Sequence, residues 1–148
     1  MEKDVIISIK GVQRYENADP DTMELVTEGR LEREGNSYTL SYQESELTGL
    51  EGTLTTFQIE PERVTLMRVG EFNSQMVFQE GRRHMSTYNT PYGAMTIGVN
   101  TRHLLAELDD QGGEIEIDYA IEIDHSVAGR NTFQINVKEA DGAVSLQV

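Results

Sequence analysis

Residues 114–124 constrain the fold more than any other part of the chain, because they alternate between two kinds of side chain. The segment reads EIEIDYAIEID, and Ala120 is the single interruption of the pattern. Successive side chains of a β-strand point to opposite faces, so this alternation predicts a strand with one apolar and one acidic face. Such a strand is longer than the usual length of about five or six residues. Its apolar face requires a strongly coiled or closed sheet that wraps around a core.

Similar alternation recurs along most of the chain. It predicts further strands at residues 5–14, 23–32, 38–42, 53–60, 63–69, 72–79, 83–90, 94–100, 132–139 and 144–148. Glycine, proline, asparagine and aspartate between these segments predict turns, for example at 34–36, 61–62, 90–93 and 128–131. Many evenly spaced short strands are typical of sandwiches and barrels.

These strands predict an all-β fold with one sheet. Short turns favour antiparallel neighbours in a meander, and closing the sheet removes exposed edges. We therefore predict a single antiparallel up-and-down β-barrel of about 8–10 strands, in one domain spanning residues 1–148. One segment departs from the pattern: Leu104, Leu105 and Leu108 recur at helical spacing after a plausible N-cap, Thr101. This spacing predicts a short helical turn near residues 102–108.

The chain is strongly acidic, which bears on the partners it can bind. Its formal net charge is −14, from 26 acidic and 12 basic residues. Contacts of Lys and Arg with phosphates supply most nucleic-acid affinity, and in the sequence the basic residues gather only at Arg82, Arg83 and His84. We therefore expect no nucleic-acid partner and no anionic membrane partner. We interpret the charge as a solubility feature rather than as steering of a basic partner.

Cysteine usage and hydropathy indicate the compartment. The chain contains no cysteine, which excludes disulfides, thiolate metal sites and thiol nucleophiles. No apolar run is long enough for a transmembrane helix. The first residues enter an alternating segment directly, without the apolar region of a signal peptide. We therefore expect a cytoplasmic protein.

Several short blocks along the chain resemble a known family. They are SYQE at 41–44, TTF at 55–57, VTLMRVG at 64–70, MVF at 76–78, YNTPYG at 88–93 and GRN at 129–131. The chain resembles the YwiB-like family, a bacterial family of unknown function with a calycin-like (lipocalin-type) β-barrel. The resemblance spans essentially the whole chain, and its most specific part is the Tyr-x-Thr-Pro-x-Gly pattern. It implies the barrel fold, and it brings no activity and no catalytic residues with it.

Candidate ligand contacts are polar residues that the strand pattern directs into the barrel. Glu44, Arg68 and Glu80 each share the parity of an apolar strand face. An isolated buried charge is very costly, so an inward Arg68 either pairs or holds an anion. In one interpretation it binds a carboxylate or phosphate of a small ligand, with the Tyr42 and Tyr88 hydroxyls beside it. In the other, Arg68 pairs internally with Glu44 or emerges at the barrel mouth.

Other residues give weaker indications. The basic cluster at 82–84 is either a docking point for an acidic partner or phosphate, or a solvated hairpin tip. His84, His103 and His125 have no metal-binding spacing, and residues 88–93 are either a functional rim or a corner. No nucleophile, zinc, dinucleotide or phosphate-loop motif is present. We therefore expect no catalytic residues, no metal and no cofactor.

Three hypotheses for function follow. The first is a barrel that binds a small amphipathic or anionic molecule inside, without catalysis, as a monomer or homodimer. The alternative is a non-catalytic protein-interaction module that uses an exposed strand or the Tyr92 rim, with a solidly packed barrel. The weakest is an enzyme that uses interior carboxylates. The large residues expected inside, and able to fill such a barrel, are Tyr38, Tyr42, Met67, Met76, Phe78 and Phe133.

Overall fold

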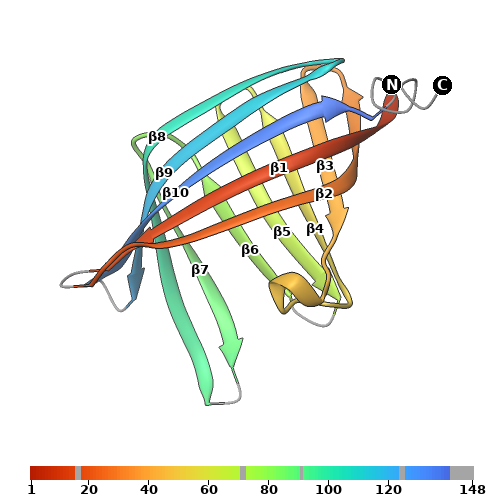
Figure 1. Ribbon diagram of the computed structural model, residues 1–148. Helices are drawn as coiled ribbons and strands as arrows, with labels where there is room; N and C mark the ends of the chain where they lie inside the picture. Colours follow the sequence, from red (N-terminus) through yellow and green to blue (C-terminus); the bar gives the residue numbers. More distant parts are fainter. Residues whose placement is uncertain (16–17, 71–72, 91, 124–125, 141–148) are drawn as a thin grey trace.

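The protein is an antiparallel barrel of ten strands in a single sheet (Figure 1). The computed structural model describes residues 1–15, 18–70, 73–90, 92–123 and 126–140, without the side chains of 87–90. The strands are β1 (Glu2–Arg14), β2 (Asp21–Glu34), β3 (Ser37–Gln43), β4 (Thr53–Glu60), β5 (Arg63–Gly70), β6 (Ser74–Phe78), β7 (Arg83–Thr90), β8 (Gly93–Asp109), β9 (Gly112–Ile123) and β10 (Ser126–Glu139). A 3-10 helix, η1 (Glu46–Thr48), follows β3.

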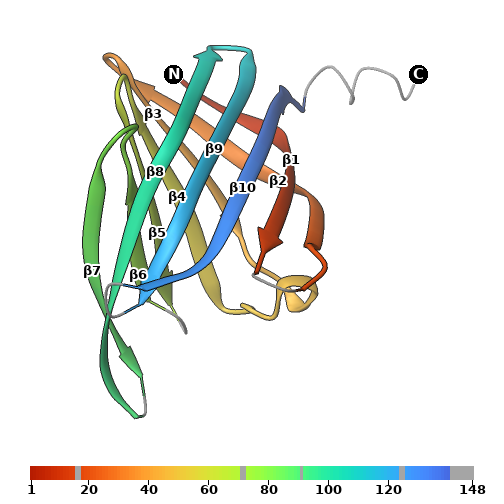
Figure 2. The same cartoon turned by 90° about the vertical axis from the view of Figure 1, so that its left-hand side faces the viewer.

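The strands form a meander whose ends join. Their order in the sheet is β6-β5-β4-β3-β2-β1-β10-β9-β8-β7, so the first and last strands pair directly. Among the described residues, β6 and β7 share no backbone ladder, and at this seam the Ser86 hydroxyl donates a hydrogen bond to the Gln75 carbonyl (3.1 Å). The tip of the β7–β8 hairpin projects beyond the barrel (Figure 2). The predicted all-β, antiparallel up-and-down barrel is confirmed, and it is nearly closed rather than fully closed.

The apolar face of each strand points into the barrel, as the alternation predicts. The described apolar residues with no exposed surface are Val5, Ile7, Leu31, Leu40, Val64, Phe78, Val99, Ile115 and Ile117. One end is also closed by polar contacts, because Asp110 accepts a hydrogen bond from the Tyr38 hydroxyl (3.2 Å) and pairs with Arg33 (2.9 Å). The prediction that Met67 points inward is wrong, because its neighbours Leu66 and Arg68 occupy the inner face of β5.

The predicted helical turn at 102–108 is also wrong: this segment belongs to the long strand β8. A β-bulge between Thr101 and His103 adds one residue and reverses the inward parity. Before the bulge Val99 and Thr101 point inward, and after it Leu104 and Leu108 do. Because of this reversal, Leu104 and Leu108 point inward, and together with the half-buried Leu105 they have the spacing of apolar residues on a helix. The helical turn of the protein lies instead at η1.

Two further turn and strand expectations have different outcomes. The predicted turn at 128–131 is wrong, because these residues lie within β10, next to a register shift between Val127 and Gly129. A bulge and a turn both favour glycine, which explains the error. The strand expected at 144–148 lies outside the described residues.

Strand β2 separates from β3 over more than half of its length (Figure 1). β2 pairs with β1 from Asp21 onward, whereas its ladder with β3 begins only at Arg30. At the branch point a Cβ on Gly29 would lie 2.3 Å from Ile7 Cδ1 and 2.5 Å from the Ser41 carbonyl oxygen. Glycine therefore permits the close approach of β1 and β3 at the point where β2 leaves the wall.

Candidate functional site

The open end of the barrel contains a cavity of about 560 Å³. It is lined by residues of β1, β2, β3, β5, β6, β8, β9 and β10 and of the segment that carries η1. Three of the four predicted ligand contacts, Tyr42, Glu44 and Arg68, line it together. Parity along separate strands therefore identified residues that meet at one site.

Glu44 is a buried carboxylate held in place by hydroxyl groups. It follows β3, and its backbone N–H donates to the Thr53 carbonyl (2.9 Å). Its side chain is 1% exposed; Oε1 accepts a hydrogen bond from Thr48 Oγ1 (2.8 Å), and Oε2 accepts one from Thr55 Oγ1. Thr48 belongs to η1, whose N-cap is Ser45. The short helix thus positions the carboxylate at the cavity wall.

Arg68 is only partly satisfied by Glu44. Its Nε atom lies 3.8 Å from Glu44 Oε2, which is an ion-pair distance but too long for a hydrogen bond. This nitrogen is buried and has no hydrogen-bond partner among the described residues. The internal pairing with Glu44 that the sequence left open therefore exists, and it leaves Nε without a hydrogen bond in a side chain that lines the cavity and is 26% exposed.

Tyr42 lies on the inner face of β3, next to Glu44 in the cavity lining. Burial raises the pKa of its hydroxyl above the ordinary value of 10.0, and the negative charge of Glu44 raises this pKa further. Arg68 acts in the opposite direction. The hydroxyl is therefore neutral at physiological pH and can donate or accept a hydrogen bond.

Apolar side chains make up much of the cavity lining. They are Val12, Met23, Leu25, Leu47, Leu50, Leu66, Met76, Ile97, Ile121 and Phe133, with Tyr119. The Tyr119 ring lies 4.7 Å from that of the fully buried Phe78 and 5.8 Å from that of Phe133 (centroid distances), so an aromatic cluster links the cavity lining to the packed core. A polar end with one unsatisfied donor and an apolar remainder suit an amphipathic guest.

The remaining sequence candidates, Tyr88 and Glu80, have different outcomes. The backbone of Tyr88 pairs with Met95 in the β7–β8 hairpin, and its side chain lies outside the described part of the chain. The expectation that Glu80 points inward is wrong, because β6 ends at Phe78. Glu80 is exposed; its Oε1 accepts a hydrogen bond from the Leu104 N–H (2.9 Å) and lies 3.4 Å from His103 Nδ1.

The residues of the basic cluster at 82–84 have different partners. Arg83 binds Glu122 with two nitrogens, at 3.0 and 3.2 Å, and His84 Nε2 lies 3.1 Å from Gln79 Oε1. Glu122 shares the outward parity expected of an acidic face, yet it is only 7% exposed. It lies beside Gly98 and under Arg83, so one residue of the predicted solvent-exposed face is buried. His125 lies outside the described residues.

Sequence reasoning missed the Thr48 and Thr55 hydroxyls that bind Glu44, and it missed the separation of β2 from β3. Thr55 shares the inward parity of Phe57 and Ile59, which was a usable signal for a polar group inside the barrel. The contribution of Thr48 had no such signal, because it depends on how η1 folds over the cavity.

Comparisons with known proteins give the family. The family model described as "Domain of unknown function (DUF1934)" matches residues 7–135. The chain belongs to this family. The DUF1934 chain is also similar to the solved structure titled "Crystal structure of ywiB protein from Bacillus subtilis", with a TM-score of 0.81 and 21% identity over 94% of this chain and 93% of that chain.

The match confirms the predicted resemblance to YwiB-like proteins of unknown function. At this identity the structural likeness shows the fold alone. The comparison with curated proteins found no match.

The described part of the DUF1934 chain has neither a metal-binding cluster nor a membrane-spanning helix. No group of three or more His, Cys, Asp or Glu side chains there is arranged to hold a metal ion. Within the same residues, no helix has the length and apolar character needed to cross a bilayer.

Proposed function

We propose that the protein is a cytoplasmic, non-catalytic barrel that binds a small amphipathic molecule with an anionic or carbonyl head group. The observation that carries this proposal is Arg68, whose side chain lines the cavity and is 26% exposed, and whose buried Nε has no hydrogen-bond partner among the described residues. A buried donor without a partner costs about 1–3 kcal/mol, and a ligand acceptor at this position would recover that free energy.

The size and lining of the cavity support a ligand of this kind. A volume of about 560 Å³ lies within the range of small-molecule sites, about 300–1,000 Å³. The head group would accept from Arg68, whose planar guanidinium suits carboxylates, with the Tyr42 hydroxyl as a second contact. The apolar body would then contact residues such as Leu66, Met76 and Phe133.

The contacts of Glu44 support binding without catalysis. Its two oxygens accept hydrogen bonds from Thr48 and Thr55, and Arg68 lies beside Oε2. A general base needs an accessible carboxylate that reaches the substrate proton. Here both oxygens are committed to the protein, so the carboxylate serves to position Arg68.

The proposal is tested with 1-anilinonaphthalene-8-sulfonate, an amphipathic anion whose fluorescence rises in apolar surroundings. The wild-type protein should bind it with one-to-one stoichiometry. Arg68→Met should weaken binding about tenfold or more, because a hydrogen bond to a charged group contributes about 1.5–3 kcal/mol. Arg63→Met is the matched control: Arg63 lies on the same strand but is exposed and pairs with Glu60 (3.2 Å).

Native mass spectrometry of gently purified protein supplies a second measurement. It should show a small anionic molecule that is present in the wild type and lost in Arg68→Met. Absence of probe binding to the wild type, or equal binding by the Arg68 and Arg63 variants, would contradict the proposal.

A second candidate function rests on the separated part of β2. Among the described residues, the edge from Asp21 to Gly29 has no ladder on the β3 side, and Val26 on this segment is 69% exposed. Free edges accept an added strand. Because Glu24 and Glu28 are also exposed there, the partner strand should be basic.

Hydrogen–deuterium exchange tests this candidate. A synthetic peptide of alternating lysine and valine should slow amide exchange at residues 22–28. A peptide of alternating glutamate and valine is the control and should not. Equal protection by both peptides, or none by either, would contradict an interaction at this edge.

A further inference from the structure

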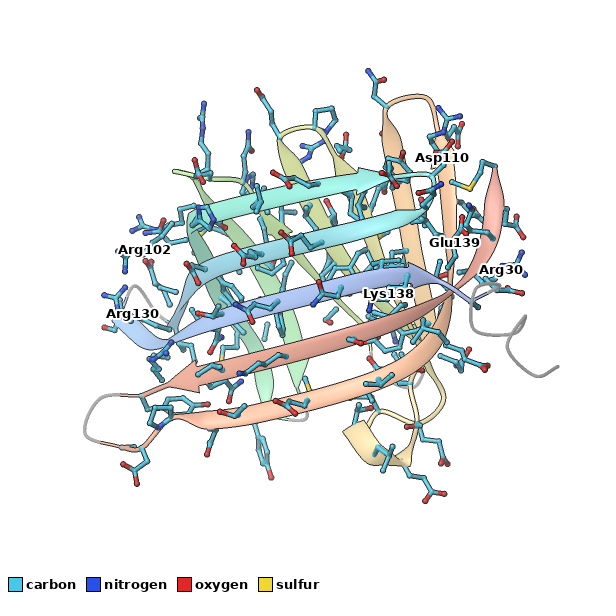
Figure 3. All side chains as sticks on the ribbon, turned by 45° about the horizontal axis from the view of Figure 1, so that its top comes forward. Arg30, Arg102, Asp110, Arg130, Lys138 and Glu139 are labelled. Atoms are coloured by element: carbon cyan, nitrogen blue, oxygen red, sulfur yellow. The ribbon has the colours of Figure 1, made fainter. Side chains whose placement is uncertain are left out.

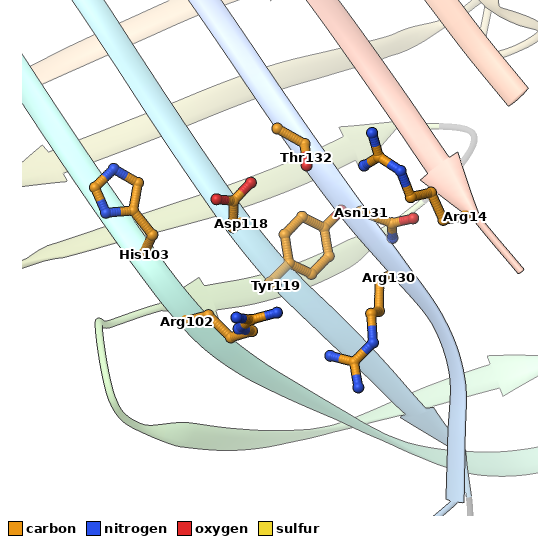
Figure 4. A pocket seen from close by; sticks show the side chains of 8 residues that line it. All are labelled: Arg14, Arg102, His103, Asp118, Tyr119, Arg130, Asn131 and Thr132. Carbon is orange, nitrogen blue, oxygen red and sulfur yellow. The ribbon is translucent and has the colours of Figure 1, made fainter. Parts of the chain in front are cut away.

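Three arginines from different strands line one pocket on the outside of the barrel wall (Figure 4). Arg14 is the last residue of β1, Arg102 lies on β8, and Arg130 lies on β10. The pocket measures about 410 Å³. Its other lining residues are His103, Asp118, Tyr119, Asn131 and Thr132. Figure 3 shows Arg102 and Arg130 close together at the same end of the sheet.

These arginines differ from most other arginines of the protein in their charge environment, and of the six others only Arg82 likewise forms no ion pair with a described residue. Five of the others lie beside a carboxylate: Arg30, Arg33, Arg63, Arg68 and Arg83. Within the described part of the chain, Arg14, Arg102 and Arg130 form no ion pair, although the chain has 26 acidic residues. Three arginines therefore line one pocket without an ion pair to any described residue.

The strand register places two of these like charges against each other. Arg14 and Arg130 are direct cross-strand partners in the β1–β10 ladder, and both have outward parity. Like charges directly opposite on one face of a sheet destabilise it. A pair that costs stability, next to a third arginine, is the arrangement expected where an anion offsets the repulsion.

Irregular backbone brings the arginines together. The register of β8 shifts between Thr101 and His103, so Arg102 is the additional residue of a bulge. A second shift lies between Val127 and Gly129, immediately before Arg130. Bulges redirect side chains and are over-represented beside functional sites. Two bulges on strands that flank β9 therefore converge on the same pocket.

We propose that this pocket binds the phosphate or diphosphate group of a small molecule. Three arginines and one aspartate leave two net positive charges in the lining when His103 is neutral. Guanidinium groups match phosphate oxygens with paired hydrogen bonds. The Thr132 hydroxyl in the same lining supplies a further donor.

The surroundings favour a small molecule over a nucleic acid. A polymer would extend from the pocket along β9, where Glu116, Asp118 and Glu122 carry the outward charges. The chain as a whole has a net charge of −14, which opposes a long polyanion. A single phosphate or diphosphate group, in contrast, needs no contact beyond the pocket.

Isothermal titration calorimetry with inorganic pyrophosphate and with orthophosphate tests the proposal, with ionic strength held constant by sodium chloride. The wild-type protein should bind at least one of the two probes with one-to-one stoichiometry. Tighter pyrophosphate binding would assign a diphosphate group, and tighter orthophosphate binding a single phosphate. Arg130→Gln should weaken binding about tenfold.

Matched variants separate the site from general charge effects. Arg82→Gln removes the same charge from an exposed position and should change affinity less than about twofold. Arg130→Gln without ligand should melt at or above the wild-type temperature, because repulsion with Arg14 is relieved, yet pyrophosphate should raise its melting temperature less than that of the wild type. Arg68→Met should bind pyrophosphate like the wild type, which keeps this site distinct from the interior cavity.

Two results would overturn the proposal. One is the absence of binding of either probe to the wild type at millimolar concentration. The other is an equal loss of affinity in Arg130→Gln and Arg82→Gln, which would mean that only net charge matters.

Discussion

Arg68 Nε and Glu44 Oε2 lie 3.8 Å apart inside the barrel, so the two residues attract each other without forming a hydrogen bond. The carboxylate is satisfied by Thr48 and Thr55, whereas this guanidinium nitrogen has no partner among the described residues. Because of this difference, Arg68 can still donate to a ligand, whereas Glu44 holds Arg68 in position.

Removing the charge of Glu44 should weaken the fold at the open end. Glu44→Gln keeps the shape but leaves Arg68 without its counter-charge, and we expect a loss of about 1–3 kcal/mol in the free energy of unfolding. Glu46→Gln, at an exposed position on η1, is the control and should stay within about 0.5 kcal/mol. Urea denaturation measures both. Equal stabilities for the two variants would show that the Glu44 contacts contribute nothing.

The raised pKa of Tyr42 predicts alkaline sensitivity. The folded state holds this proton above pH 10, whereas the unfolded chain releases it near the ordinary value of 10.0. Stability is therefore complete below about pH 10 and falls as the pH rises towards the folded-state pKa. Tyr42→Phe removes this contribution and should flatten the decline between about pH 10 and 12.

Unfolding measured in this pH window by circular dichroism tests the prediction, with Tyr15→Phe as an exposed control. Parallel curves for the wild type and Tyr42→Phe would contradict it.

The branch point of β2 should tolerate no side chain. In Gly29→Ala the new Cβ meets the Ser41 carbonyl oxygen, which belongs to the backbone and cannot rotate away. We expect a loss of about 1–3 kcal/mol. Gly11→Ala is the comparison, because its nearest contact is the Phe133 ring at 3.3 Å and requires a smaller adjustment. Thermal melts should rank Gly29→Ala below Gly11→Ala, and the reverse order would contradict the close approach at Gly29.

Two arginine–glutamate pairs should differ in their contribution to stability. Arg83 binds Glu122, whose side chain is 9% exposed, whereas Arg63 binds Glu60, whose side chain is 32% exposed. Arg83→Met leaves a buried carboxylate unpaired, and we expect a loss of about 1–2 kcal/mol because Arg83 itself is half exposed.

Arg63→Met should cost less than about 1 kcal/mol. Denaturant unfolding of both variants measures the difference. A similar effect for the two would mean that the burial of Glu122 does not govern the pair.

Much of the candidate site was accessible from the sequence. Parity alone directed Tyr42, Glu44 and Arg68 inward, and the structure brings all three to one cavity. The same rule failed for Glu80, because it assumes that the strand continues and β6 ends at Phe78. It failed for residues 102–108 because one additional residue in a bulge reverses parity without a distinctive signal.

The antiparallel barrel could be predicted from the residues alone, because alternation of apolar and polar side chains is a local property of each strand. The structure was needed to show where β2 leaves β3, where the cavity lies, and that Arg14, Arg102 and Arg130 share a pocket. Along the sequence, basic residues gather only at 82–84. In the fold, Arg14, Arg102 and Arg130 also line one pocket, so the sequence pattern missed a second basic cluster. The physical reason is that register between distant strands, and the bulges that shift it, depend on the packing of the whole sheet rather than on neighbouring residues.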